Sequence, residues 1–315
     1  MSQPLLFVDN LSVSYPSPQG PIEALHRLTF SVDEGSCLAI VGESASGKST
    51  AALSILGLLP PSAAVTGGRI VFSSRQKGTI DLIAASQKDM RMIRGAEISA
   101  IFQDAMDSLD PVYDIGSQID EVLLLHRFRR DERRRTVDEL LTRVGLGDGR
   151  LYPHELSGGM RQRLAISIAL AARPALLIAD EVTTALDREN RTSVLSLIAR
   201  SMEEDGLSVL LITHDLDVAR TLADHILVIH SGRLVEAARS TTILDRPAHP
   251  YTQALLDATP SRHHRKERGH LPPSASSGCP FAGTCTYAQA DCQSAFPAAT
   301  DLGGGHFLAC HRRPS

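Results

Sequence analysis

A glycine-rich loop between an apolar strand and a helix constrains the fold of this 315-residue chain more than any other feature. Residues Cys37–Val41 are continuously apolar, which is typical of a strand buried on both faces of an α/β sheet. The segment Gly42–Thr50 has the pattern G-x-x-x-x-G-K-[ST], and the apolar stretch Ala51–Leu59 comes directly after it. A strand, a phosphate loop and a helix in this order predict the core of a P-loop NTPase.

The loop is expected to bind a nucleotide mainly through its backbone. Amides of the loop and of the helix N-terminus point toward one anion. Lys48 adds a positive charge beside the phosphates, and the Ser49 hydroxyl can ligate Mg²⁺. A glycine turn with an incidental lysine is the alternative, and the flanking strand and helix disfavour it. The predicted nucleotide-binding residues of the loop are Gly42, Glu43, Ser44, Ala45, Ser46, Gly47, Lys48, Ser49 and Thr50.

A second apolar strand ends in two acids. Residues 175–179 are apolar, and Asp180 and Glu181 follow at the carboxyl end, where α/β sheets bind ligands. We expect Asp180 to hold Mg²⁺ and Glu181 to polarise the attacking water as the catalytic base. Two loop acids without a role are the alternative, which the phosphate loop disfavours.

A third segment, 156–163 with the sequence LSGGMRQR, lies one helix before the acidic strand. Its glycines leave backbone amides open, and Ser157 is placed to cap the helix that follows. Such a helix start is a second phosphate-binding end. Because the chain already has one phosphate loop, we expect this second end to face the nucleotide of a neighbouring chain.

These segments resemble ABC transporter nucleotide-binding subunits, and the resemblance covers almost the whole chain. It implies that Tyr15 stacks on adenine, that Gln103 contacts Mg²⁺ and relays to the membrane subunit, and that His214 lies near the γ-phosphate. It also implies that Asp187, in the segment 185–187, belongs to a loop that crosses a dimer of cassettes. The residues implied to bind the partner's ATP are Ser157, Gly158, Gly159 and Gln162; the implied catalytic residues are Glu181, His214 and Gln103; the implied Mg²⁺ ligands are Ser49, Gln103 and Asp180.

The sequence departs from the usual family pattern at a few positions. Ala45 stands where glycine is common, and Val182 replaces the familiar proline after the catalytic acid. Ala105 and Asp107 replace proline and threonine after Gln103. None of these changes removes a charged or hydroxyl ligand, so hydrolysis is still expected.

Two further segments resemble the dipeptide, oligopeptide and nickel importer branch of that family: residues 106–111 after Gln103, and residues 249–256 with the sequence HPYTQALL. The resemblance implies a transport-coupled ATPase that energises import of di- or oligopeptides, with nickel or another small solute as the alternative. It implies a second, different ABC ATPase subunit, two transmembrane permease subunits and an extracytoplasmic substrate-binding protein as partners. Two cassettes of this family sandwich two ATP molecules head to tail.

Charge and composition bear on the remaining classes of partner. A formal charge of −4 and 4% aromatic residues without tryptophan provide neither a general attraction to nucleic acid nor a stacking platform. No apolar run reaches the roughly 20 residues that span a bilayer, and the N-terminus lacks a signal-peptide pattern. We therefore expect a peripheral protein at the cytoplasmic face of the inner or plasma membrane, with no nucleic-acid partner. A soluble ABC ATPase of DNA repair or translation is the alternative from another class.

The predicted fold class is α/β: a P-loop NTPase (RecA-like) core with an N-terminal antiparallel β subdomain, an inserted helical subdomain and a small C-terminal cysteine-containing extension. Strand-like stretches occupy 5–8, 11–15 and 28–32, and residues 226–236 predict a hairpin. Apolar residues at helical spacing predict the helical subdomain at about 87–160, with a charged run at 127–135 as a solvated face. The nucleotide-binding domain is expected at 1–240 and the extension at 241–315.

Four of the five cysteines lie in this extension: Cys279, Cys285, Cys292 and Cys310. In a reducing cytosol, four thiols favour a metal site over disulfides. The spacing lacks the C-x₂-C pair of a zinc ribbon, and four thiolates also suit an iron–sulfur cluster. Some dipeptide-importer ATPases have a comparable tail with a 4Fe–4S cluster, so the resemblance implies this cluster. Zinc, unligated thiols and a redox sensor stay open as alternatives, and Cys37 is expected to be a small buried residue.

Overall fold

The structure is a computed structural model that describes residues 3–103, 108–184, 186–258 and 278–312. The chain divides into two compact units, each assembled from segments that are distant in sequence. The first unit comprises Met1–Leu6, Val32–Ser36 and Phe72–Leu211, and the second comprises Phe7–Ser31, Cys37–Val71 and Ile212–Ser315.

The strands of the first unit are β5 (Gly78–Asp81), β6 (Ile98–Ile101), β7 (Leu176–Asp180) and most of β8 (Ser208–Thr213). Strands β6 and β7 pair in parallel, with Ile98 opposite Leu176. Every residue of β7 and β8 is buried. Strands buried on both faces favour continuous apolar runs, and this explains why the sequence alone locates them.

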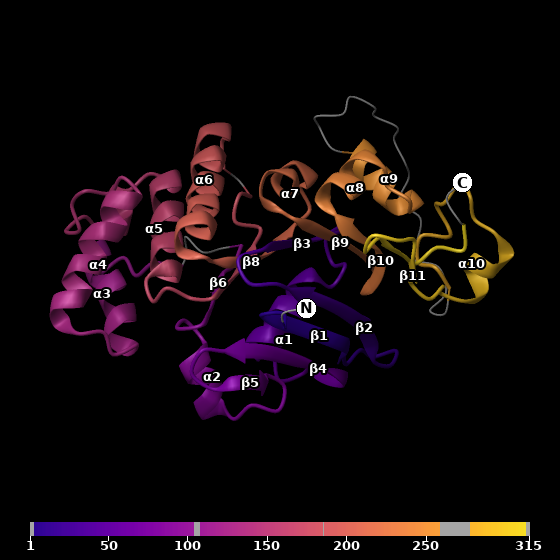
Figure 1. The fold of residues 1–315 in the computed structure, drawn as a ribbon, viewed down its shortest axis with the longest axis horizontal. Coiled ribbons are helices and arrows are strands. Elements are labelled where there is room, and N and C mark those ends of the chain that lie inside the picture. Colours follow the sequence, from indigo (N-terminus) through magenta and orange to yellow (C-terminus); the bar gives the residue numbers. More distant parts are fainter. Residues whose placement is uncertain (1–2, 104–107, 185, 259–277, 313–315) are drawn as a thin grey trace. The chain divides into compact units, whose positions relative to one another are not determined.

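The helices of the first unit are α2 (Gln87–Ile93), α3 (Ile115–Leu125), α4 (Arg130–Arg143), α5 (Gly158–Leu170) and α6 (Arg188–Asp205), with a 3₁₀ turn at Pro153–Glu155. Helices α3, α4 and α5 pack on one another (Figure 1). Helix α3 buries Ile115, Ile119 and Leu123, which recur at the spacing of one helix face.

The predicted helical range 87–160 is not helical throughout, because β6 lies within it. Its run of four residues is too short for periodicity to separate a strand from a helix. Pairing with β7 decides the outcome. The charged run at 127–135 is mostly exposed, as predicted, although Arg133 is half-buried and bonds Asp120 at 2.8 Å.

The second unit contains most of β1 (Leu6–Tyr15), β2 (Ile22–Val32) and β4 (Ala64–Ser74), with β1 between the other two. The sequence predicted two strands where β1 runs without interruption. Asn10 joins the two halves with a φ of 50°, a left-handed conformation that asparagine tolerates. This residue locally breaks the alternation that a continuous strand would show.

A mixed sheet of the second unit runs in the order β3 (Cys37–Val41), β9 (His225–His230), β10 (Arg233–Arg239), β12 (Phe307–Leu308) and β11 (Thr300–Asp301). Strands β3 and β9 are parallel, whereas β9 and β10 form the predicted antiparallel hairpin. Ser231 and Gly232 in its turn have φ values of 47° and 73°, which are the two positive values of a type I′ turn. The helices of this unit are α1 (Lys48–Leu56), α7 (Leu216–Leu222), α8 (Ser240–Asp245), α9 (Pro250–Asp257) and α10 (Ala290–Ser294).

The cysteine-containing segment is part of the second unit rather than a detached tail. Strand β12 pairs antiparallel with β10, with Leu308 opposite Glu236, and the Ala309 amide donates to the Val235 carbonyl at 2.9 Å. Figure 1 shows this segment, in yellow, beside β10. Periodicity was too weak to predict this pairing, because β11 and β12 have only two residues each.

Glu236 connects three parts of this arrangement. Its side chain is fully buried on β10 and accepts hydrogen bonds from the amides of Ala248 at 2.7 Å and His249 at 2.9 Å. The His306 ring, in the loop between β11 and β12, lies with its Nε2 2.8 Å from the same carboxylate. A buried carboxylate is stable only when such donors replace the water that it loses.

Glu236→Ala is expected to lower the free energy of unfolding by about 2–5 kcal/mol, because buried donors then lose their acceptor. Urea unfolding followed by circular dichroism measures this loss. The exposed Glu34→Ala is the control and should change stability by less than about 0.5 kcal/mol. Equal effects of the two substitutions would contradict the anchoring role of Glu236.

Candidate functional site

The phosphate loop follows β3 and leads into α1, as predicted. Two of its glycines are required by close backbone approaches. A Cβ atom at Gly42 would collide with the carbonyl oxygen of Ile229 in β9. Gly47 has a φ of 101°, and a Cβ there would lie 2.6 Å from the Ala24 carbonyl oxygen. Any side chain at either position would therefore displace the loop.

Lys48 is buried under this loop. Its Nζ atom donates to the carbonyl oxygens of Gly42 and Glu43, each at 2.7 Å. These bonds hold the positive charge of Lys48 at the start of α1, where it and the backbone amides together favour the binding of an anion. Ala45, where glycine is common in the family, has a φ of 61° and so adopts the left-handed conformation that glycine would take without strain.

Two other predicted nucleotide contacts belong to the same unit. The Tyr15 hydroxyl lies 3.5 Å from the Thr50 hydroxyl, which places the tyrosine at the first turn of α1. His214 is exposed directly after β8. Next to it, Asp215 caps α7 by accepting from the amides of Asp217 and Val218, so the position of the histidine is defined by a capped helix start.

The acidic strand end lies in the first unit. Asp180 is the buried last residue of β7, and Glu181 follows with a φ of 54°. The Thr184 hydroxyl donates to the Glu181 carboxylate at 2.7 Å, and the Thr184 amide donates to the Glu181 carbonyl at 3.0 Å. These bonds give the carboxylate a defined orientation. A left-handed backbone at a non-glycine residue is often a feature of functional sites.

The LSGG segment is joined to the loop before α6 within the first unit. Ser157 caps α5 by accepting from the Met160 amide at 3.4 Å. Asp187 caps α6 and also accepts from the Asn190 side chain, both at 2.8 Å. The amide and then the side chain of Asn190 hold the pKa of Asp187 below its usual value. Asn190 is packed so closely against Gly159 that a Cβ there would overlap it.

Sequence reasoning missed Asn190, and it did not foresee the contact that Gln162 makes. Gln162 is 4% exposed, and its side-chain amide donates to the Val182 carbonyl at 2.9 Å. It is thus directed at the turn after Glu181 rather than outward with Ser157. Gln103 is exposed after β6. Four positions of the predicted segments after Gln103 and before Asp187 lie outside the described residues: Ala105, Met106, Asp107 and Ala185.

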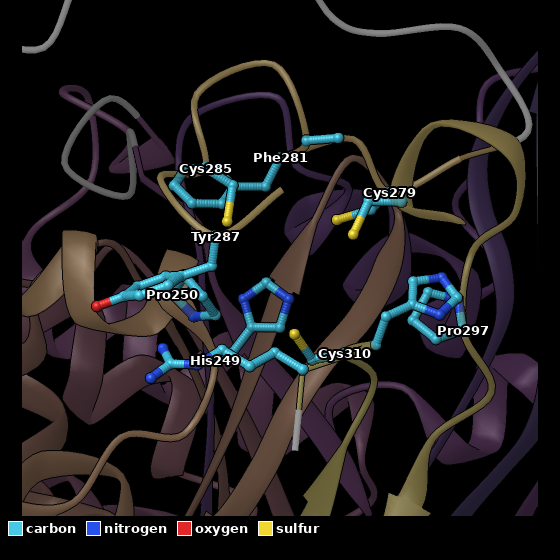
Figure 2. A pocket seen from close by; sticks show the side chains of 12 residues that line it. His249, Pro250, Cys279, Phe281, Cys285, Tyr287, Pro297 and Cys310 are labelled. Atoms are coloured by element: carbon cyan, nitrogen blue, oxygen red, sulfur yellow. The ribbon is translucent and has the colours of Figure 1, made fainter. Parts of the chain in front are cut away.

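The four cysteines of the C-terminal segment converge on one cavity of about 20 Å³ in the second unit. Figure 2 shows the thiol groups of Cys279, Cys285 and Cys310 around it, together with the His249 ring. Cys292 completes the set, and its carbonyl accepts from the Cys279 amide at 2.7 Å. The fold thus brings cysteines that are up to 31 positions apart in the sequence to the same cavity.

Burial and mutual proximity both disfavour thiolates in this cavity. Burial raises the pKa of Cys279 and of Cys310, and the neighbouring cysteines raise both pKa values further. A cation would reverse this preference. Cys37 is separate from the set: it is 1% exposed, and burial raises the pKa of its thiol, as expected for a small core residue.

Among the described residues, no group of three or more His, Cys, Asp or Glu side chains is arranged to hold a metal ion. Within the same part of the chain, no helix has the length and apolarity needed to cross a bilayer.

An unexpected contact links helix α9 to the phosphate loop. Tyr251 of α9 is 1% exposed, and its hydroxyl accepts a hydrogen bond from the Glu43 amide at 3.0 Å. Its ring lies 4.1 Å from that of His230 and 5.4 Å from that of Phe281, measured between centroids. Phe281 in turn lines the cysteine cavity. The HPYTQALL sequence had indicated a family branch but no contact.

Comparison with known families accounts for both halves of the chain. Residues 25–184 match the ABC transporter family, and residues 235–292 match the C-terminal region of oligopeptide/dipeptide transporters. The predicted resemblance is thereby confirmed.

Curated relatives match over nearly the full chain. The dipeptide transport ATP-binding protein DppD of Bacillus subtilis is 40% identical over 97% of this chain and 94% of its own. The dipeptide transport ATP-binding protein DppD of Escherichia coli is 40% identical, over 98% of this chain and 96% of its own length. A probable peptide ABC transporter ATP-binding protein of Sinorhizobium fredii is 42% identical over 98% and 95%.

Solved structures show the same fold. A dimeric post-hydrolysis state of the ATP-binding cassette MJ0796, bound to ADP and Pi, superimposes with a TM-score of 0.65 at 28% identity. It covers 75% of this chain and 98% of its own. The cbiO1 protein of Clostridium perfringens, part of an ABC transporter complex, superimposes with a TM-score of 0.66 at 26% identity. The match covers 78% of this chain and 92% of cbiO1. The predicted P-loop NTPase fold is confirmed, and the chain belongs to the ABC transporter family as an ATP-hydrolysing cassette.

Proposed function

We propose that this cassette energises the import of di- or oligopeptides. The observation that carries the proposal is the match of one chain to both the ABC cassette and the oligopeptide/dipeptide C-terminal region. Relatives named as dipeptide or peptide transport proteins support the same substrate class. Growth on a dipeptide as the required amino-acid source, in a strain deleted for this chain, tests it. Growth equal to wild type on the dipeptide, with loss of nickel uptake instead, would contradict it.

The hydrolytic roles follow from the chemistry of the described side chains. The phosphate loop with Lys48 would hold the phosphates of ATP, and Ser49 and Asp180 are the side chains that would ligate Mg²⁺. Glu181, oriented by Thr184, accepts a proton from the attacking water. Gln103 would contact the metal, and His214 would contact the γ-phosphate.

A second cassette completes each site in this proposal. Ser157 is exposed at the start of α5, and the amides of this helix start would bind the γ-phosphate of the partner's ATP. Asp187, which is also exposed, belongs to the same face through Asn190. The dimeric state of the related cassette MJ0796 supports this assembly. The partner is a second ABC subunit, which we propose to be a different chain.

Membrane subunits are the other proposed partners, which places the protein as a peripheral subunit at the cytoplasmic face. Large apolar side chains before and at the end of α3 are exposed, among them Val112 at 74% and Leu125 at 70%. Exposed apolar groups favour a protein partner over water. Two permease subunits that receive this region, and a binding protein that delivers the peptide, would complete the importer.

Glu181→Gln is expected to keep ATP binding but to lower kcat by about 10²–10⁴-fold, because an amide cannot accept the proton. ATP should then hold the cassette dimer closed. Phosphate release and ATP-dependent dimer formation in size-exclusion chromatography measure the two effects. The exposed Glu203→Gln on α6 is the control and should hydrolyse ATP normally. Normal turnover by Glu181→Gln would remove this residue as the base.

Tyr251→Phe is expected to raise KM for ATP by about tenfold while kcat changes little. The Glu43 amide then loses its acceptor, at a cost of about 1–3 kcal/mol, and about 1.4 kcal/mol corresponds to tenfold in affinity. Steady-state hydrolysis and equilibrium binding of a fluorescent ATP analogue provide the measurements. The exposed Tyr113→Phe is the matched control. An unchanged KM in Tyr251→Phe would show that the loop does not depend on this bond.

We further propose that the four cysteines hold a 4Fe–4S cluster. In a zinc site the sulfurs would converge to about 3.8 Å from one another, given Zn–S bonds of about 2.3 Å. Thiolates bound to the separate irons of a cluster are spaced more widely. Four thiols line one cavity, and ligation by four thiolates suits such a cluster. A bound cluster would supply a one-electron redox centre or a clamp on the segment.

Anaerobically purified full-length protein is expected to contain about four irons per chain and to show a broad visible absorbance band near 400 nm. Cys292→Ser should lose both signals. Cys37→Ser, which changes the one cysteine outside the cavity, should keep them. Zinc, or no metal at all, in the wild type would overturn the cluster.

A further inference from the structure

His249 is the residue before α9, and its ring is buried against the cysteine cavity. It is 1% exposed and lines the cavity together with the cysteines (Figure 2). Phe281 lies 6.4 Å from it between ring centroids, His230 is close enough to act on its pKa, and the Glu236 carboxylate accepts from the His249 backbone amide. A polar ring in such a place needs partners for both of its nitrogen atoms.

The tautomer of this ring follows from one contact. The Tyr251 amide donates to Nδ1 of His249 at 3.0 Å, so Nδ1 is the acceptor and carries no proton. In the neutral ring the proton is therefore on Nε2. Burial favours that neutral ring by lowering the pKa of His249 to about 4. Nε2 is buried and has no hydrogen-bond partner among the described residues.

We propose that the Nε2–H group of His249 donates a hydrogen bond to a sulfur atom of the cluster or of its thiolates and thereby raises the reduction potential of the site. The proposal rests on the iron–sulfur cluster proposed above. The observation that carries it is a buried N–H donor without an acceptor at the edge of a cavity lined by four thiols.

The effect on the potential follows from charge. Reduction adds one negative charge, which is shared by the sulfur atoms. A hydrogen bond to sulfur stabilises this charge, and hydrogen bonds to the sulfurs are among the factors that set the potential of a cluster. A donor without a net charge can act in this way at low cost, because no ionic group has to be desolvated.

The other nitrogen-bearing side chains at the cavity are already engaged. His311 has its Nε2 3.0 Å from the Ala295 carbonyl, which can only accept, so its neutral ring presents an acceptor at Nδ1. The Arg312 guanidinium lies 3.7 Å from the centroid of the Tyr287 ring, and the charge and backbone amide of Arg312 also act on the Cys310 thiol. Among the side-chain nitrogens that line the cavity in the described part of the chain, His249 Nε2 is the one that is buried without a hydrogen-bond partner. A cluster sulfur or a thiolate could be its acceptor.

His249→Asn tests the proposal, because asparagine retains an acceptor for the Tyr251 amide and is a good helix cap but places no N–H at the position of Nε2. The measurement is a reductive titration of the anaerobically purified full-length protein, followed by electron paramagnetic resonance. We expect His249→Asn to keep the wild-type iron content and to have a lower midpoint potential. His249→Gln, whose longer amide can reach the position of Nε2, should restore most of the difference.

His311→Asn is the matched control, since it alters a histidine of the same cavity whose Nε2–H is already bonded, and its potential should stay near that of wild type. An unchanged potential in His249→Asn with full iron content overturns the role of His249 and leaves the cluster intact. Wild-type protein without iron overturns both the cluster and this inference.

A measurement on the unsubstituted protein covers the case in which His249→Asn fails to retain iron. Reduced wild-type and His311→Asn proteins labelled with ¹⁵N-histidine should both show a weak nitrogen coupling to the electron spin in pulsed spectra. Absence of this coupling in both proteins overturns the hydrogen bond.

Discussion

Close backbone contact around the phosphate loop is the constraint on which the nucleotide-binding half of the structure depends. The loop passes so near to β9 and to the start of β2 that Gly42 and Gly47 leave no room for side chains. The Gly232 amide, in the turn between β9 and β10, donates to the Ser46 carbonyl at 2.9 Å. Lys48 closes the loop from beneath. The amides that bind phosphate are therefore oriented before ATP arrives, so little order has to be imposed on binding.

The start of α9 extends this constraint to the C-terminal segment. Within three residues, His249 faces the cysteine cavity and Tyr251 binds the Glu43 amide of the phosphate loop. Glu236 fixes the same stretch by accepting from the Ala248 and His249 amides. The cysteine cavity and the phosphate loop are more than 200 residues apart in sequence. Both nevertheless contact the same short buried segment at the start of α9. Hydrogen bonds of buried groups at the start of α9 thus connect the surroundings of the two sites.

Much of the site was predictable because its residues act through local geometry. A strand, a glycine-rich turn and a helix place Lys48 and Ser49 wherever that pattern occurs, and the same holds for Asp180 at the end of a buried strand. Gln162 was not predictable: its spacing in LSGGMRQR groups it with Ser157, yet the helix turns its side chain inward toward Val182. Asn190 was missed because an asparagine in a helix carries no motif, and its role depends on contact with Gly159 across two segments.

The sequence by itself determined the class of the protein, since its pattern of apolar residues and three motifs in a fixed order specify a P-loop ATPase with a signature helix. It also indicated that four cysteines share a purpose. Only the tertiary structure decided that β12 joins the sheet of the second unit, that the thiols meet at one cavity, and that Tyr251 supports the phosphate loop. The reason is physical: strand pairs of two residues and single hydrogen bonds leave no periodic signal, and they form only where distant segments are packed together.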